Sequence, residues 1–519
     1  MALLEIRNLT ISFPSGKGFQ TVVDNLSFTV EKGEIFGLVG ESGSGKTMTA
    51  LAAAGLLRHR GALVKGEILL DGMNILDLDP KDMRRLQGRD IGMIFQEPMT
   101  SLNPSKTIGW QIEETLRLHT DLSKDERKKR AIKAIRQAEL PDPERIYNSY
   151  PHQLSGGQRQ RAMIAAALVI KPRLLLADEP TTALDVTVQR EILSLIERTC
   201  KADGTSVLFI SHDLSIVRML CSRMLVMQNG RAVEEGRSED IFTSPSDHYT
   251  KELIESIPRF SRCPNERRKD QETVLSVSGL SAFYPKDSGS FLRKKEKTQI
   301  LNNVSLNVHK GEIVGLCGES GCGKTTLARC ILGLHKDYIG SVKSSTDRPQ
   351  MVFQDAGSSL NPSKTVEWIL EEPLRNCTSL TAEQRKRCVS EMLYLVKLPE
   401  ELKARYPHQL SGGQRQRVSI AAALMLEPRF LIADEPVSAL DVTVQKQILE
   451  LLEEIARETG VAVLLISHDL RTVSRLCKYV LIMKDGEIAE EGEPCKVFSH
   501  PNAEYTKKLL MSAGFTEGI

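Results

Sequence analysis

IFGLVGESGSGKT, at Ile35–Thr47, joins an apolar run to a glycine-rich loop. The apolar half is typical of a buried strand, and the loop fits the pattern G-x-x-x-x-G-K-[ST]. In that pattern a strand precedes the loop and a helix follows it. The glycines let backbone amides turn inward around a phosphate, and the helix N-terminus adds partial positive charge. We therefore expect a phosphate-binding loop here, the alternative being a glycine-rich turn without a ligand.

The whole arrangement occurs twice in the chain. IVGLCGESGCGKT at Ile313–Thr325 repeats the strand and the loop, and YPHQLSGGQRQR begins at both Tyr150 and Tyr406. These last two copies lie 256 positions apart (406 minus 150). A period this long indicates two duplicated domains rather than a solenoid of short repeats. Two loop matches in the same strand–loop–helix context also argue against a turn without a ligand.

Composition and patterning predict two α/β domains. The chain has 519 residues, of which 41% are hydrophobic and 26% are charged, as in ordinary soluble globular proteins. We expect a first domain at 1–262, a polar linker at 263–273 and a second domain at 274–519. Each half alternates short apolar runs with longer helical patterns, which favours a largely parallel sheet. The patterns that begin at Ser123 and Thr381 predict helix starts with capping boxes.

Several protein classes fit this composition poorly. The net charge is +2, so no overall field favours nucleic acid as a partner. No stretch approaches the roughly 18 apolar residues of a transmembrane helix, and we expect no direct membrane insertion. The ten cysteines form no CxxC pair and no metal-like grouping with histidine, so we expect reduced thiols that mostly fill cores. If the protein works on a membrane, other subunits must hold it there.

Two adjacent carboxylates follow a buried-strand pattern in each half, in LLLADE and FLIADE. Asp178 and Asp434 suit a magnesium site. Glu179 and Glu435 suit the polarisation of a water toward a γ-phosphate. The alternative is a solvated pair of charges at a strand end. An acidic pair that occurs twice, downstream of a phosphate-binding loop each time, favours the site.

LSGGQ, at Leu154–Gln158 and Leu410–Gln414, makes the chain similar to the ATP-binding cassette family, whose signature sequence it is. Other family elements accompany it in order along almost the whole chain. They match the Q-loop glutamine (Gln96, Gln354), the D-loop (Ala183-Leu184-Asp185, Ala439-Leu440-Asp441) and the switch histidine (His212, His468). Phe13 and Tyr284 lie where the family stacks an aromatic ring on adenine, with ordinary core packing as the alternative.

The resemblance implies ATP and Mg²⁺ as cofactors and assigns residues to three roles. The catalytic residues expected are Glu179, Glu435, His212, His468, Gln96 and Gln354. Nucleotide binding is expected of Phe13, Gly40, Glu41, Ser42, Gly43, Ser44, Gly45, Lys46, Thr47, Tyr284, Gly318, Glu319, Ser320, Gly321, Cys322, Gly323, Lys324, Thr325, Thr326, Ser155, Gly156, Gly157, Gln158, Ser411, Gly412, Gly413 and Gln414. Magnesium ligation is expected of Thr47, Gln96, Asp178, Thr325, Gln354 and Asp434.

The fold implied is two P-loop ATP-binding domains, each a RecA-like core with an antiparallel β-subdomain and a helical subdomain. The halves should face each other head to tail and enclose two composite MgATP sites, each with one half's phosphate loop and the other half's signature. Neither half lacks a motif, so both sites should hydrolyse ATP. Closure with ATP and opening after hydrolysis would drive partner membrane subunits.

Three further stretches resemble the branch of the family that imports dipeptides, oligopeptides, nickel or metal-chelate opines. They are FQEPMTSLNP at Phe95–Pro104, FQDAGSSLNP at Phe353–Pro362 and the tail pattern at Glu234–Leu253. In that branch the two ATPases are usually separate, and this chain resembles one of each type joined. The resemblance implies two transmembrane permease subunits, an extracytoplasmic solute-binding protein and a peripheral place on the cytoplasmic face of the cell membrane.

The chain departs from the family pattern in places. Lys46 to Gln96 is 50 residues but Lys324 to Gln354 is 30, which puts the second antiparallel subdomain in doubt. Met48 replaces the hydroxyl residue that Thr326 supplies in the other loop, and we expect a weaker α-phosphate contact at the first site. The basic insertion at 286–299 is expected to be a solvated loop, with a membrane or partner contact as the alternative. Some relatives carry an iron–sulfur cysteine cluster after the cassette, but only Cys263 and Cys495 fall in those regions here, so we expect no cluster.

Two rival interpretations belong to other classes. A soluble fused cassette ATPase that acts on ribosomes or nucleic acid usually inserts a long charged helical arm or zinc-binding cysteines, and neither pattern occurs here. A fused sugar-importer ATPase commonly has one degenerate site, whereas both halves here carry the complete set of motifs.

Overall fold

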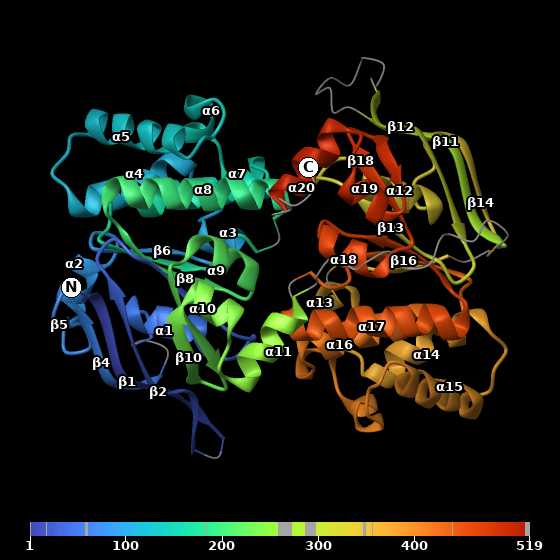
Figure 1. Cartoon of the computed structure of the whole chain (residues 1–519), viewed down its shortest axis with the longest axis horizontal. Helices are drawn as coiled ribbons and strands as arrows, with labels where there is room; N and C mark the ends of the chain where they lie inside the picture. The colour runs from blue at the N-terminus through green and yellow to red at the C-terminus, as the bar shows by residue number, and fades with distance from the viewer. Residues whose placement is uncertain are drawn as a thin grey trace. The chain divides into compact units, whose positions relative to one another are not determined.

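The structure is a computed structural model that describes residues 2–16, 18–57, 61–182, 184–257, 272–285, 297–345, 349–354, 356–438 and 440–513. The chain divides into two compact units, formed chiefly by residues 1–257 and 258–519 (Figure 1). Most of the expected linker, most of the basic insertion at 286–299, and Ala183 and Ala439 of the D-loops lie outside the described residues.

A six-stranded sheet with strand order β10-β9-β3-β8-β7-β6 forms the centre of the first unit. Its strands are β3 (Ile35–Val39), β6 (Ile91–Ile94), β7 (Leu174–Asp178), β8 (Ser206–Ser211), β9 (Arg223–Gln228) and β10 (Arg231–Arg237). All neighbours pair in parallel except β10 with β9. Strand β7 is buried on both faces, and Leu174 and Leu175 belong to different core clusters because successive side chains point to opposite faces.

An antiparallel sheet with order β2-β1-β4-β5 packs over one face of the central sheet. Its strands are β1 (Ala2–Ser15), β2 (Gly18–Glu31), β4 (Leu63–Leu70) and β5 (Met73–Asn74). Leu4 and Ile6 of β1 share a buried cluster with Leu51 of the helix that follows the phosphate loop and with Leu38 of β3. That helix therefore lies in the interface of the two sheets, where its position is fixed by packing.

Helices cover the other face and form a separate subdomain. The helices of the first unit are α1 (Lys46–Ala53), α2 (Pro80–Leu86), α3 (Pro98–Ser101), α4 (Ile108–His119), α5 (Lys124–Gln137), α6 (Pro143–Asn148), the 3₁₀ turn η1 (Pro151–Gln153), α7 (Gly156–Leu168), α8 (Val186–Asp203), α9 (Leu214–Leu220), α10 (Ser238–Thr243) and α11 (His248–Ser256). The capping box predicted at Ser123 is present at the start of α5, and the one at Thr381 is present in the second unit.

The second unit repeats this plan with order β15-β16-β17-β13-β18-β19 in its central sheet. Its strands are β11 (Thr273–Pro285), β12 (Lys297–His309), β13 (Ile313–Cys317), β14 (Tyr338–Ser344), β15 (Gln350–Val352), β16 (Phe430–Asp434), β17 (Ala462–Ile466), β18 (Tyr479–Lys484) and β19 (Glu487–Gly492). Its helices are α12 (Lys324–Ile331), α13 (Ala356–Ser359), α14 (Val366–Cys377), α15 (Ala382–Leu395), η2 (Glu400–Ala404), η3 (Pro407–Gln409), α16 (Gly412–Leu424), α17 (Val442–Thr459), α18 (Leu470–Leu476), α19 (Pro494–Ser499) and α20 (Glu504–Ser512).

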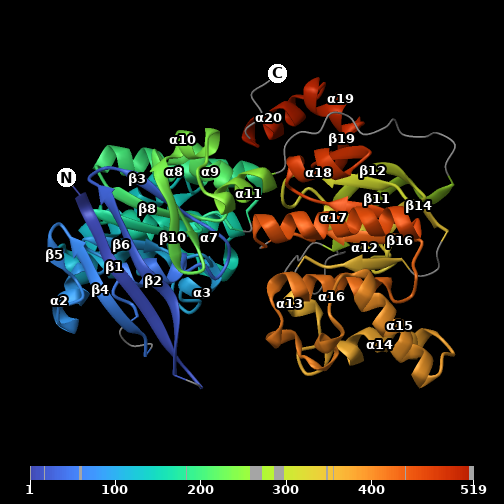
Figure 2. The same cartoon turned by 60° about the horizontal axis from the view of Figure 1, so that its bottom comes forward.

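The doubt about the second antiparallel subdomain is resolved by its sheet. That sheet has order β12-β11-β14, so within the described residues it keeps three strands where the first unit has four. The shortening therefore removes the counterpart of β5 and leaves the subdomain in place. Figure 2 shows this sheet on one side of the second unit and helices α14 and α15 on the other.

Eight cysteines are free thiols in the part of the chain that the structure describes, and six of these are buried. Cys495 is disulfide-bonded, so the expectation of reduced thiols throughout is wrong at that position. Among the described residues, no helix has both the length and the apolar character needed to span a bilayer.

Candidate functional site

The predicted catalytic and magnesium-binding residues of each unit, with the phosphate loop, gather at the carboxyl ends of four adjacent strands. In the first unit the phosphate loop follows β3, Gln96 follows β6, the pair Asp178 and Glu179 lies at the end of β7, and His212 follows β8. Parallel strands place these ends at one edge of the sheet, which is where α/β proteins bind ligands. The second unit has the same order of elements.

The backbone of each phosphate loop requires glycine. Gly40 has a φ of 147°, and a Cβ atom there would lie 2.2 Å from the carbonyl oxygen of Met227. Gly318 meets the same obstacle in the second unit, again at 2.2 Å. Gly45 is the N-cap of α1 with a φ of 99°. Since it has no side chain to occupy the amides of the first helical turn, that end of the helix is open to an anion.

The loop lysines are buried inside their own loops. Lys46 donates from Nζ to the carbonyl oxygens of Gly40 and Glu41, both at 2.7 Å. Lys324 makes the two equivalent bonds at 2.8 Å. Burial lowers the pKa of the Lys46 ammonium, and the negative charge of Glu179 opposes that shift. The two loop carbonyls thus hold the ammonium, and no carboxylate among the described residues is hydrogen-bonded to it.

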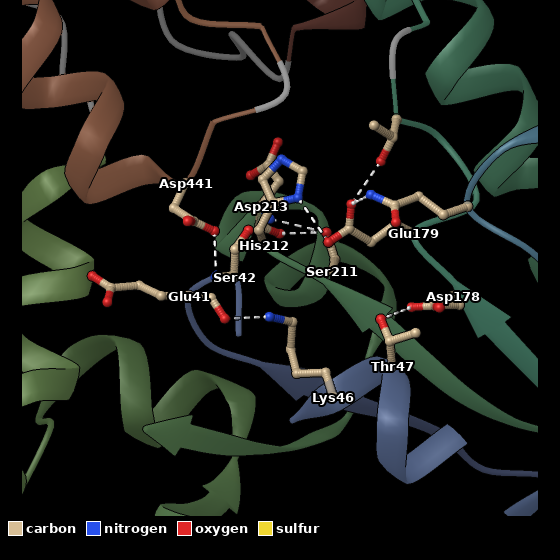
Figure 3. A network of polar contacts seen from close by, with 12 residues as sticks. Glu41, Ser42, Lys46, Thr47, Asp178, Glu179, Ser211, His212, Asp213 and Asp441 are labelled. Carbon is tan, nitrogen blue, oxygen red and sulfur yellow. Dashed lines mark hydrogen bonds and ion pairs between the residues drawn. The ribbon is translucent and has the colours of Figure 1, made fainter. Parts of the chain in front are cut away.

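The aspartate at the end of β7, and its counterpart at the end of β16, is buried and has a raised pKa. Asp178 accepts a hydrogen bond from Thr47 Oγ1 at 3.2 Å, which brings together two of the predicted magnesium ligands (Figure 3). Burial raises the pKa of Asp178 to about 6, and it raises that of Asp434 to about 6 as well. A cation beside either carboxylate would favour its charged form.

The glutamate that follows has a strained backbone in both units. Glu179 has a φ of 46° and Glu435 a φ of 45°, in the left-handed region that non-glycine residues rarely adopt. The strained residue is fixed by the neighbouring strand, since Glu179 N donates to Ile210 O at 3.0 Å and Glu435 N to Ile466 O at 2.9 Å. Strain of this kind clusters at functional sites, where surrounding structure over-determines it.

Both oxygens of this glutamate have hydrogen-bonding partners. His212 Nδ1 lies 3.1 Å from Glu179 Oε1, and Gln96 donates from Nε2 to Oε2 at 2.9 Å. The second unit repeats the two contacts at 3.2 Å and 2.7 Å. Burial alone would raise the pKa of Glu179, but the hydrogen bond and charge of His212 outweigh it and lower that pKa. The same pair raises the pKa of His212 against the effect of burial.

The signature residues complete the start of a helix. Gln158 N donates to Ser155 Oγ at 3.4 Å and Ser155 N to Gln158 Oε1 at 3.2 Å, which is a capping box at the N-terminus of α7. Ser411 and Gln414 form the same box at α16. A Cβ atom on Gly157 would lie 2.7 Å from Val188 Cγ1, so this glycine also permits close packing on α8.

The two aromatic positions differ from each other. Phe13 is partly buried and packs against the core cluster beneath the antiparallel sheet. Tyr284 stacks on His335, with ring centroids 4.5 Å apart and planes inclined by 19°. Met48, which departs from the family pattern, packs against the same cluster as Phe13, so its side chain has a structural role.

Sequence reasoning missed one pair of residues that contact the loops. Tyr249 Oη accepts a hydrogen bond from Glu41 N at 3.2 Å, and Tyr505 Oη accepts one from Glu319 N at 3.1 Å. The two tyrosines lie 256 positions apart (505 minus 249), the period of the whole repeat. That shared register is the signal that could have identified them.

Comparison with known proteins agrees with the fold. The sequence model of the ABC transporter family matches residues 23–182 and 301–438, and that of the oligopeptide/dipeptide transporter C-terminal region matches 233–284. The chain is 41% identical over 533 residues to the peptidoglycan transport ATP-binding protein YejF of Agrobacterium fabrum, covering 100% of this chain and 97% of the relative. It is 40% identical over 560 residues to the glutathione import ATP-binding protein GsiA of Shigella flexneri. That match covers 99% of this chain and 90% of the relative.

The chain therefore belongs to the ABC transporter family, as a tandem ATPase of its oligopeptide/dipeptide branch. Both cassettes are ATP-binding domains, as the resemblance implied. One solved structure is a complex of an archaeal ribosome recycling factor with a ribosomal stalk protein. The match to it covers 97% of this chain and 92% of the matched chain, with a TM-score of 0.63 and 20% identity. At that identity the likeness concerns the fold alone.

Proposed function

We propose that the chain hydrolyses ATP at two sites and thereby powers import of a peptide or peptide-like solute through partner membrane subunits. The observation that carries this proposal is the constellation around each glutamate. A partly buried carboxylate on a strained backbone is bonded to a histidine and a glutamine, beside a buried phosphate-loop lysine, and the arrangement is equally complete in both cassettes. Neither cassette has lost a catalytic side chain.

The proposed roles follow from the geometry of each residue. The loop amides and Lys46 would hold the β- and γ-phosphates, once the ammonium leaves its own loop carbonyls. Glu179 would accept a proton from the attacking water, and His212 would hold that carboxylate in place. In the second cassette Lys324, Glu435 and His468 would do the same.

Three residues, from α1, the end of β7 and the segment after β6, fit a magnesium ion. Thr47, Asp178 and Gln96 supply oxygen donors of the kind that Mg²⁺ prefers, and a cation there would offset the burial that raises the pKa of Asp178. Thr325, Asp434 and Gln354 are the corresponding residues of the second cassette. When bound, the ion would supply charge stabilisation to the phosphates.

The arrangement of the two nucleotide sites is also proposed. Each site is proposed to combine one cassette's phosphate loop with the other's signature, because a signature that contacts the γ-phosphate must approach from the side that the loop leaves open. Phe13 and Tyr284 are proposed to stack on adenine. The boundary between cassettes is proposed at 263–273.

Two features favour a peptide-like solute. The C-terminal region of the first cassette matches the oligopeptide/dipeptide transporter model, and relatives are named for import of glutathione and transport of peptidoglycan, both of which contain peptide chemistry. We propose two permease subunits and an extracytoplasmic solute-binding protein as partners, with this chain on the cytoplasmic face of the membrane. Nickel and metal chelates remain the alternative solutes.

The Q-loop regions, defined as 97–113 and 355–371, are the surface proposed for the permease subunits. Large apolar side chains at or just before them are exposed, with Met99 at 60% and Phe353 at 49%. Asp355 itself lies outside the described residues. Exposed apolar side chains of this size favour a protein partner.

Reconstitution tests this function directly. The chain would be co-expressed with candidate permease subunits, placed in proteoliposomes, and assayed for ATP-dependent uptake of a labelled dipeptide, glutathione or a nickel chelate. We expect uptake of the peptide-like solute, and we expect it to require ATP on the side of the membrane where this chain lies. Co-purification with ribosomes rather than with membrane subunits would favour the rival function.

A further inference from the structure

Each phosphate loop is contacted by a tyrosine from the C-terminal helix of its own cassette. Tyr249, on α11, is 7% exposed, and its Oη accepts from the amide of Glu41 at 3.2 Å. Tyr505, on α20, is half-buried and accepts from the amide of Glu319 at 3.1 Å. The contact thus occurs twice, in the same register of the repeat, between segments that are distant in sequence.

The tyrosines are held in place by a built polar anchor. Glu234 of β10 accepts from Ser246 N at 2.8 Å and from Ser246 Oγ at 2.7 Å, which fixes the turn before α11. Asp247 Oδ1 then accepts from Tyr249 N at 2.8 Å and caps the helix. In the second cassette Glu490 of β19 accepts from Asn502 N at 2.8 Å. An acidic residue of the last strand therefore orients each tail helix toward its loop.

The peptide group that the tyrosine holds also faces the loop lysine. The Glu41 amide donates to Tyr249, while the carbonyl oxygen of the same peptide group, which belongs to Gly40, accepts from Lys46 Nζ at 2.7 Å. Burial raises the pKa of Tyr249 to about 12, so the phenol stays neutral and its oxygen remains a hydrogen-bond acceptor. A single side chain outside the motif thus fixes the backbone that positions the lysine.

We propose that Tyr249 and Tyr505 are positioning residues of the two nucleotide sites, which hold the start of each phosphate loop in the conformation that receives the phosphates. This inference rests on the proposed function and adds the tail helices to the machinery of each site. A tail helix that served only to complete the core would not need a hydroxyl directed at the loop backbone.

The test uses the full chain with one loop disabled. Lys324→Ala leaves the first loop as the site measured, and Tyr249→Phe removes only the acceptor oxygen. We expect the Kd for MgATP, MgADP and inorganic pyrophosphate to rise by about 2- to 10-fold, the range that loss of one hydrogen bond produces. Tyr505→Phe in a Lys46→Ala chain should raise the same Kd values, now at the second loop, by a similar factor. Titration with a fluorescent nucleotide, with pyrophosphate as competitor, gives the constants.

Tyr394→Phe in the Lys324→Ala chain is the matched control, because Tyr394 is 87% exposed on α15. Its Kd values should equal those of the parent. Unchanged phosphate affinity in Tyr249→Phe would overturn the positioning role, and so would an affinity loss that merely follows a lower unfolding temperature of the nucleotide-free protein. If the Lys324→Ala parent binds no MgATP at all, the proposed function and this inference fail together.

Discussion

Gln96 donates a hydrogen bond from Nε2 to Glu179 Oε2 at 2.9 Å. Gln96 begins the segment that leads from the central sheet into the helical subdomain, whereas Glu179 ends a strand of the sheet. The contact therefore ties the entry to the helical subdomain to the carboxylate proposed to activate water. Gln354 and Glu435 repeat the contact at 2.7 Å, so both cassettes have the same link between the Q-loop and this carboxylate.

The first prediction concerns that carboxylate. Glu179→Gln combined with Glu435→Gln should lower ATP turnover by about 10²–10⁴-fold, the usual cost of removing an acid–base group, while ATP binding is retained. The amide fills the same space, and it keeps one oxygen to accept a hydrogen bond. Phosphate release measures turnover and nucleotide titration measures binding. Glu239→Gln, at an exposed position of α10, is the charge-matched control. Wild-type turnover in the double variant would disprove the catalytic assignment.

The second prediction follows from the His212–Glu179 pair and its counterpart. The raised pKa of His212 means that the pair stabilises the fold fully below the ordinary value of 6.5 and loses this effect as pH rises through the raised pKa. The lowered pKa of Glu179 means that the effect is present above 4.5 and is lost as pH falls through the lowered pKa. The full contribution therefore lies between those two ordinary values.

Thermal unfolding of nucleotide-free protein checks this window. The double variant His212→Gln and His468→Gln should unfold at a lower temperature than wild type near pH 5.5, by the equivalent of about 1.5–3 kcal/mol for each charged hydrogen bond. The gap should shrink as pH rises toward 9. A gap that stays constant or widens with pH would contradict a charged histidine in the pair.

The third prediction tests the surface proposed for the permease subunits. Met99→Glu should weaken co-purification with those subunits, because a charge would replace an apolar side chain at the contact. Met219→Glu is the control, since Met219 on α9 is exposed to nearly the same extent, 58% against 60%. Pull-down from detergent-solubilised membranes measures the retained fraction. Equal retention of both variants would show that Met99 is not at the interface.

Much of this site could be predicted from the sequence because its parts are local. The capping box at Ser123 depends on residues within one helical turn, and the phosphate loop depends on glycines next to a strand and a helix. Both local structures are present where the sequence predicts them, the capping box at the start of α5 and the glycine-led start of α1. The doubled motifs further fixed the number of cassettes.

Other features depend on which strands become neighbours, and this information is not local. Gln96, Glu179 and His212 meet because β6, β7 and β8 are adjacent in the sheet, although more than a hundred residues separate the first from the last. The left-handed backbone of Glu179 has no signal in residue type, since glutamate does not favour it. The contact of Tyr249 with the loop likewise depends on where the tail returns.

The last prediction concerns which signature serves which phosphate loop. If the sites are composite, Lys46 works with Ser411 and Lys324 with Ser155. Cysteines introduced in pairs can distinguish this from sites contained within one cassette. Ser320, Ser155 and Ser411 are all exposed, so Ser320→Cys can be combined with either Ser155→Cys or Ser411→Cys. Cys322, also in the second loop, is a poorer probe, because it is only 6% exposed and burial raises its pKa.

The experiment needs a chain whose ten native cysteines are replaced and a protease site near residue 265. A short bifunctional maleimide is added with MgATP in the Glu179→Gln and Glu435→Gln background, which should favour a closed state, and the chain is then cut. The Ser320→Cys and Ser155→Cys pair should keep the two halves together on a denaturing gel. The Ser320→Cys and Ser411→Cys pair should release them, because both cysteines then lie in the same half. Release of the halves in the first pair under every nucleotide condition would rule out the head-to-tail arrangement.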